Sequence, residues 1–98
     1  MPAVSREGDE IITGHGCDTT ATILEHSDNV FANGIPVSRL GDAIAPHTIL
    51  SGITCVPHFA VVNEGSSTVF VNGISVARVG DSADLGNIIQ GSSNVFAG

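Results

Sequence analysis

Residues 65–81 read GSSTVFVNGISVARVGD, and this stretch decides the expected fold. Val, Ile and Thr dominate it, and short β-branched runs bounded by Gly and Ser are typical of strands. Its Asn72-Gly73 step lies between two such runs, and Asn-Gly is the strongest short signal for a hairpin with a type I′ turn. The stretch therefore predicts two short strands joined by a tight turn. Asn33-Gly34 predicts a second such hairpin.

The pattern around this stretch occurs three times along the chain. R-x-G-D sequences begin at Arg6, Arg39 and Arg78, which are the only basic residues apart from histidine. We expect these to be solvated turns without chemistry of their own. Each is followed by a variable segment and then by a Val-Phe pair, at Val30-Phe31, Val69-Phe70 and Val95-Phe96. We expect a single mainly β domain over residues 1–98, with units at about 6–34, 39–73 and 78–98. Such a threefold repeat gives one chain the approximate shape needed to cap a trimer.

Composition excludes several classes of function. The chain has 98 residues, an aromatic fraction of 4% and neither Trp nor Tyr, so its core must be thin. Small domains of this kind often need a cross-link, a metal or a partner. A net charge of −7 without any Lys argues against binding nucleic acid or anionic lipid. No apolar run is long enough to span a membrane, and the first residues lack the pattern of a secretory signal.

The residues that can bind metals lie only in the first two units. They are His15, Cys17, His26, His47, Cys55 and His58. His26 stands four residues before Val30, where the other units have Gly65 and Gly91, so it occupies an ordinary turn position. The other five lie in the variable segments, where the units differ from one another.

Cys55 and His58 form a C-x-x-H step, which we interpret as two ligands of one metal ion. His15 and His47 can add two more ligands from separate loops. Three His and one Cys complete the tetrahedral shell that structural Zn²⁺ prefers, and metal binding would stabilise a thinly cored domain. Imidazole also suits iron, but zinc is the expected ion.

Cys17 leaves three alternatives open. It can replace His15 as a ligand, form a disulfide with Cys55, or be a small buried residue, which is the commonest state of a free Cys. Because no export signal is visible, a reduced pair is the starting assumption.

Catalytic signatures are missing. The sequence contains neither a G-x-S-x-G elbow nor an H-E-x-x-H helix. A short, Gly-rich chain also offers little volume for a substrate pocket. We therefore expect no enzyme activity and no small-molecule substrate.

The pattern over residues 65–81, repeated more loosely over residues 27–42, resembles the PAAR-repeat family. The segment Ser75-Val76-Ala77-Arg78 stands where that family has its name-giving letters, and residues 13–18 look most like the stand-alone members in contractile phage tails. The resemblance implies a conical β tip on the blunt end of a trimeric β-helical spike, in a phage tail or a type VI secretion system. It also implies one zinc ion held by three His and one Cys, here His15, His47, Cys55 and His58.

From this resemblance we expect one tip per spike trimer, assembled in the cytoplasm and driven into a target cell envelope. The edges that meet the spike are expected to include Val30, Phe31, Val69, Phe70, Val95 and Phe96. Two alternatives remain open. One is a small zinc-dependent hydrolase with three protein ligands and a bound water. The other is a secreted β domain cross-linked by a Cys17–Cys55 disulfide.

Overall fold

The computed structural model describes all 98 residues and consists of short strands and turns without any helix. Ten strands are present: β1 (Glu10–Ile12), β2 (Thr20–Thr22), β3 (Phe31–Ala32), β4 (Ile35–Pro36), β5 (His47–Ser51), β6 (Thr54–His58), β7 (Phe70–Val71), β8 (Ile74–Ser75), β9 (Ser82–Ala83) and β10 (Gly86–Ile88). The expectation of a small, mainly β domain is therefore confirmed. No helix of the length and hydropathy that a membrane crossing requires is found.

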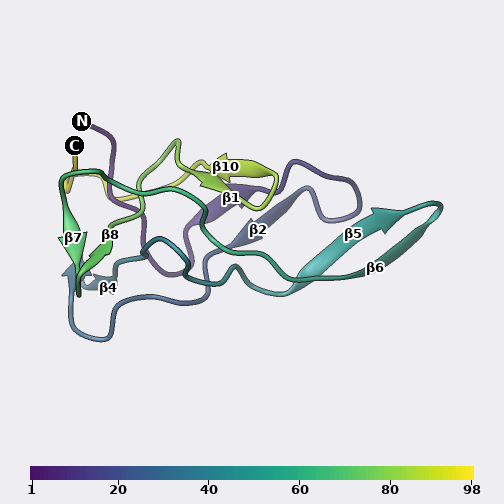
Figure 1. Cartoon of the computed structure of the whole chain (residues 1–98), viewed down its shortest axis with the longest axis horizontal. Helices are drawn as coiled ribbons and strands as arrows, with labels where there is room; N and C mark the ends of the chain where they lie inside the picture. The colour runs from purple at the N-terminus through teal and green to yellow at the C-terminus, as the bar shows by residue number, and fades with distance from the viewer.

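The molecule is elongated, with extents of 41 × 24 × 21 Å. Figure 1 shows the β3–β4 and β7–β8 hairpins together with both chain ends at one extremity, which we call the blunt end. The four-stranded sheet β2-β1-β10-β9 occupies the middle. The antiparallel β5–β6 pair projects at the opposite extremity, and we call it the apex hairpin.

Both Asn-Gly steps form the predicted tight turns. Asn33 and Gly34 have φ values of 58° and 75°, and Asn72 and Gly73 have values of 56° and 76°. Positive φ at both central residues defines the type I′ turn, which matches the twist of the flanking strands. These turns connect β3 with β4 and β7 with β8, as the sequence predicts.

A third hairpin is assembled from the two ends of the chain. Ala3 forms an antiparallel bridge with Phe96, and the Val4 amide donates to the Val95 carbonyl at 2.9 Å. The equivalent bond within the second unit runs from the Val76 amide to the Val69 carbonyl at 3.1 Å. The first residues of the chain therefore pair with its last residues as the two arms of one hairpin do.

The three units meet in a closed ring of backbone hydrogen bonds. The Ser5 amide donates to the Ala77 carbonyl, the Ala77 amide to the Ser38 carbonyl, and the Ser38 amide to the Ser5 carbonyl, each at 2.9 Å. These residues precede the three R-x-G-D arginines by one position. Because each unit donates to one neighbour and accepts from the other, the ring establishes the pseudo-three-fold arrangement.

The R-x-G-D turns are not simply solvated, contrary to the sequence-based expectation. Their aspartates are only 4%, 6% and 6% exposed, at Asp9, Asp42 and Asp81. Each carboxylate accepts hydrogen bonds from the backbone amide and the guanidinium of the arginine three residues earlier, at 2.8 to 3.2 Å. The same turn recurs in each unit because a buried carboxylate must be paired and fully hydrogen-bonded.

The core is aliphatic and divided into two clusters. The cluster at the blunt end contains Val4, Ala32, Val37, Val71, Val76 and Ala97. The cluster in the middle contains Ile11, Ile23, Ile44, Val62, Ala77, Ala83 and Ile88. Neither includes an apolar residue of the apex hairpin, so other interactions must hold that hairpin to the body.

Candidate metal centre

Four side chains converge where the apex hairpin joins the body. They are His15, His47, His58 and Asp84, and their ligand atoms all lie within 4.8 Å of one another. His47 opens β5 and His58 closes β6, and the two residues are direct partners in the antiparallel register. His15 comes from the loop between β1 and β2, residues 13–19, which we call the His15 loop. Asp84 comes from the turn between β9 and β10.

The spacing of these atoms fits a tetrahedral metal shell. The Nε2 atoms of His15 and His47 are 3.2 Å apart, and they lie 2.8 and 2.7 Å from Oδ2 of Asp84. Nε2 of His58 lies 3.0 Å from Oδ1 of the same carboxylate. Ligands held at about 2.0–2.1 Å in a tetrahedron around Zn²⁺ are about 3.3–3.4 Å from one another. The four side chains therefore need only small adjustments to hold one ion.

Backbone carbonyls set the tautomers of two of the imidazoles. Nδ1 of His15 lies 3.0 Å from the Gly16 carbonyl, and Nδ1 of His47 lies 2.8 Å from the Ala45 carbonyl. A carbonyl only accepts, so each Nδ1 donates its proton, and in the neutral rings both Nε2 atoms then carry a lone pair. Two imidazole lone pairs and a carboxylate oxygen thus face one point, an arrangement that requires either protons or a cation there. The same outer hydrogen bonds commonly orient histidine ligands in metal sites.

The carboxylate at the centre favours its charged form. Burial raises the pKa of Asp84, but the hydrogen bonds from His58, His15 and His47 outweigh this effect and the pKa lies below its usual value. Burial lowers the pKa of His15, but its bonds to the Gly16 carbonyl and to Asp84 outweigh that effect, and the pKa lies above its usual value. Only 2% of the Asp84 side chain is exposed, compared with 26% for His58. The charged carboxylate and the raised His15 pKa both indicate that the cluster attracts positive charge.

Two glycines allow the His15 loop to approach the Asp84 turn. A Cβ atom on Gly14 would collide with the backbone carbonyl of Leu85, and one on Gly86 would collide with the carbonyl of Ile12. The Leu85 amide donates to the Thr13 carbonyl at 3.0 Å across the same contact. The absence of side chains at these positions brings His15 and Asp84 within hydrogen-bonding distance.

The structure places Cys55 outside this cluster. Its sulfur is bonded to Cys17 in a disulfide, so the expectation of a reduced pair is corrected and the thiolate ligand is replaced. The physical reason is the strand period: successive side chains alternate between the two faces of β6, so Cys55 and His58, three residues apart, point to opposite faces. A C-x-x-H step shares one ion in a turn but not along an extended strand. Asp84 stands where the sulfur ligand was expected.

His26 and Asp84 complete the comparison with the sequence-based expectations. His26 remains away from the cluster, with Nδ1 2.7 Å from the Ser27 carbonyl and Nε2 3.5 Å from Glu7. Asp84 was not singled out, because carboxylates are common and the third unit has no His or Cys. Its position carries a signal nonetheless: it follows Asp81 in the variable segment of the third unit, just as His15 and His47 follow Asp9 and Asp42.

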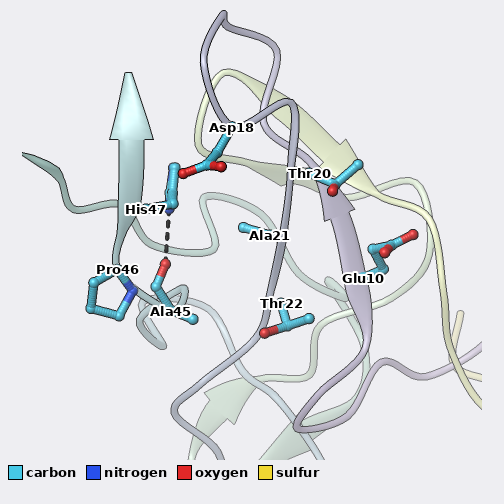
Figure 2. A pocket seen from close by; sticks show the side chains of 8 residues that line it. All are labelled: Glu10, Asp18, Thr20, Ala21, Thr22, Ala45, Pro46 and His47. Carbon is cyan, nitrogen blue, oxygen red and sulfur yellow. Dashed lines mark hydrogen bonds between the residues drawn. The ribbon is translucent and has the colours of Figure 1, made fainter. Parts of the chain in front are cut away.

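An open hollow of about 320 Å³ lies beside the cluster, between β2 and the segment leading into β5. Figure 2 shows its lining, with Asp18 beside His47 and the bond from His47 to the Ala45 carbonyl. Hydrogen bonds from the amide and hydroxyl of Thr48 lower the pKa of Asp18. The Asp18 carboxylate accepts hydrogen bonds from Thr48 in β5, so this side of the hollow belongs to the contact between the His15 loop and the apex hairpin.

The six residues expected to meet a partner lie exposed in the three hairpin units. Phe31, Phe70 and Phe96 are 55%, 57% and 50% exposed. Val30, Val69 and Val95, which precede them, are 36%, 38% and 37% exposed. Figure 1 places β3 and β7, which begin at Phe31 and Phe70, at the blunt end together with the C-terminus. The near-equal values show that the three units present the same apolar pair in the same setting.

The sequence matches the PAAR motif family over residues 13–86 and again over residues 54–98. The two matches overlap and together extend to the end of the chain, as expected for a sequence in which the motif is repeated. No curated protein matches the chain closely enough to serve as a relative. With the repeated hairpins and the His/Asp cluster described above, this match carries the assignment: the chain belongs to the PAAR motif family, a family of structural proteins that associate with spike proteins at the tip of contractile injection machinery.

Proposed function

We propose that this protein is a metal-stabilised tip that caps the trimeric β-helical spike of a contractile phage tail or type VI secretion system. The blunt end binds the spike and the apex hairpin leads into the target cell envelope. One tip is bound per spike trimer. The single observation that carries the proposal is the equivalence of the three apolar pairs at the blunt end.

That equivalence matches the symmetry of a trimer. A partner with exact three-fold symmetry presents three identical chain ends, and a monomer can meet all three only if its own surface repeats. Phe31, Phe70 and Phe96 differ by no more than seven percentage points in exposure, from 50% to 57%. Three exposed Val-Phe pairs at one end of an acidic protein support a binding surface there, since large exposed apolar patches on soluble proteins commonly mark interaction sites. The adjoining short strands can also extend the partner's strands by backbone hydrogen bonds.

Zinc is the proposed ion, held by His15, His47, His58 and Asp84. Bound there, it would supply a fixed cross-link between three segments distant in sequence. Four N and O donors at tetrahedral spacing close the shell, as in structural zinc sites, whereas catalytic zinc keeps a position open for water. The donor set therefore favours a structural ion over the hydrolase alternative. Iron is a weaker candidate because it commonly takes more than four ligands, so these four protein donors would leave its shell incomplete.

The proposed action is mechanical. Force applied at the blunt end is transmitted along the body to the apex, where no apolar residue contributes to a core. Covalent and coordinate cross-links stabilise a narrow projection that is too small to bury a hydrophobic interior. No bond in the target is broken, so no catalytic residue is assigned.

Two measurements test the proposal together. Metal analysis of protein purified without added zinc should give one zinc per chain. Co-purification with a candidate trimeric spike, followed by mass measurement of the intact complex, should give one tip for three spike chains. A complex with three tips per trimer would remove the symmetry argument. Purified protein that neither contains metal nor takes up zinc would remove the metal.

A further inference from the structure

The apex hairpin is attached to the body with little hydrophobic burial. No side chain from residue 48 to residue 57 is buried, and Ile53 at the turn is fully exposed. An isolated two-stranded hairpin is at best marginally stable in water. The attachments that remain are hydrogen bonds to the His15 loop, the His/Asp cluster and the Cys17–Cys55 disulfide.

The hydrogen bonds to the loop are few and lie near the surface. The Leu50 amide donates to the Gly16 carbonyl and the Asp18 amide to the Thr48 carbonyl, both at 3.2 Å. The Asp18 carboxylate accepts from the Thr48 amide at 2.8 Å. Exposed hydrogen bonds of this kind contribute little net stability because water competes for the same groups. The stronger connections are therefore the cluster and the disulfide.

The cluster and the disulfide both join the His15 loop to the apex hairpin, but at different positions along the hairpin. The cluster ties His15 to the root of the hairpin, where His47 and His58 are register partners. The disulfide ties Cys17, two residues further along the same loop, to Cys55. Cys55 pairs with Leu50, three residues from the root along each strand. Each connection closes the His15 loop onto the hairpin without using any residue of the other.

We propose that the disulfide and the metal cluster are redundant cross-links. Either one holds the apex hairpin against the His15 loop when the other is absent. This inference rests on the proposed metal site and goes beyond it by giving the disulfide a role. The two cross-links depend on different conditions: the disulfide on the redox potential, and the metal cluster on the zinc concentration and the pH. Zinc binding needs deprotonated imidazoles and a carboxylate but no change of oxidation state. The tip would thus keep its shape both in a reducing solution that contains zinc and in an oxidising solution that lacks it.

The redox step is an exchange with an external disulfide, such as oxidised glutathione or a disulfide oxidoreductase. The thiols of Cys17 and Cys55 lose two protons and two electrons, and one S–S bond forms between them. The oxidant's S–S bond breaks, and its two sulfurs take up the two electrons and two protons as thiols.

The test compares four states of the full chain by amide hydrogen exchange. They are the oxidised protein and the Cys17→Ser/Cys55→Ser variant, each with zinc chloride or with a chelator. The Leu50 and Asp18 amides report on the contact between hairpin and loop, and the amides of Ser5, Ser38 and Ala77 report on the body. Removing only the zinc or only the disulfide should accelerate exchange of the Leu50 and Asp18 amides by less than about tenfold. Removing both should accelerate it by more than about a hundredfold, while the body amides stay protected.

Three results would overturn the inference. Rapid exchange of the Leu50 and Asp18 amides in the oxidised protein with chelator would make the metal the only effective cross-link. Rapid exchange in the zinc-loaded serine variant would make the disulfide the only effective one. Full protection after joint removal would show that neither is needed. Zinc content of both proteins separates this inference from the proposed function. Oxidised protein that binds no zinc contradicts both, whereas a serine variant that binds zinc without protecting Leu50 contradicts only the inference.

Discussion

Nε2 of His15 lies 2.8 Å from Oδ2 of Asp84, although 69 residues separate the two in sequence. This contact joins the first unit to the third and supplies the cluster with its only negative charge. It therefore gives the most direct test of the donor set.

Replacing Asp84 by Asn should weaken zinc binding by more than about tenfold, since loss of a partner that only orients a ligand already costs about 10–100-fold. The amide keeps the size of the side chain but removes its charge. Competition with a chromophoric chelator measures the change. Asp28→Asn, on an exposed turn, is the matched control and should bind zinc as the parent does. Equal affinities in the two variants would place the fourth ligand elsewhere.

Replacing His58 by Ala should reduce bound zinc and lower the thermal midpoint, because the root of the apex hairpin loses one of its two links to Asp84. His58 is the most exposed of the three imidazoles, so its removal creates little cavity. Metal analysis and thermal unfolding measure both effects. His26→Asn should leave the zinc content unchanged. Loss of zinc in that control would mean that His26, and not only the clustered imidazoles, binds the ion.

The stabilisation that zinc provides should vanish on acidification. In the metal-free protein the pKa of His15 is raised, so its protonated form contributes stability that is present below the unfolded value of about 6.5 and is lost as pH rises through the folded value. Zinc requires the deprotonated ring, so its stabilising effect has the opposite sign of pH dependence. The shift in thermal midpoint on adding zinc should be large at about pH 8 and absent by about pH 5. A shift independent of pH over this range would exclude imidazole ligands.

The three phenylalanines of the blunt end should contribute equally to spike binding. Single variants Phe31→Ala, Phe70→Ala and Phe96→Ala should each weaken binding by about tenfold, as is common for buried aromatic contacts at interfaces. Their losses should agree within about twofold because their exposures are nearly equal. Phe59→Ala is the control, since Phe59 follows the apex hairpin and is 75% exposed. A single dominant phenylalanine would argue against a three-fold partner surface.

Replacing Gly86 by Ala should lower both stability and zinc affinity. The new Cβ meets the Ile12 carbonyl, and Gly86 does not have a positive φ, so the cost arises from crowding alone. We expect about 1–3 kcal/mol from the forced backbone shift. The shift moves the Asp84 turn away from His15, so zinc affinity should fall too. Asn87→Ala places an alanine at the neighbouring position of β10 without the collision, so it is the control and should keep the zinc affinity of the parent. Wild-type zinc affinity in Gly86→Ala would show that the close approach does not position the carboxylate.

The parts of the fold that sequence predicts are those with local causes. Asn33-Gly34 and Asn72-Gly73 each determine a turn within four residues, and both hairpins form as predicted. The arrangement about a common axis follows from the repeat, because equivalent sequences make equivalent contacts. The pairing of Ala3 with Phe96 does not follow from the repeat, because the repeated pattern begins at Arg6 and the residues before it carry no matching motif.

The cluster shows where local reasoning fails. Three of its members are histidines that the sequence singles out, because imidazoles outside the repeat positions are conspicuous. Asp84 is one carboxylate among ten acidic residues, and only its place after Asp81 in the third unit distinguishes it. The assignment of Cys55 as a metal ligand is wrong because a C-x-x-H spacing fits one ion in a turn, whereas these residues lie on the extended strand β6. Which face a side chain occupies depends on the secondary structure, and so does the choice between ligand and disulfide.

The pairing of residues 2–4 with residues 95–97 has a consequence for how the fold is encoded. Gly98 and Met1 occupy the positions that Asn33 and Gly34 occupy in the first hairpin, so residues 1–98 follow one circuit around the axis. The information for the structure is therefore cyclic: it specifies which segments follow one another around the axis. A permuted sequence with residue 98 joined to residue 1 and a break between Asn33 and Gly34 would encode the same circuit.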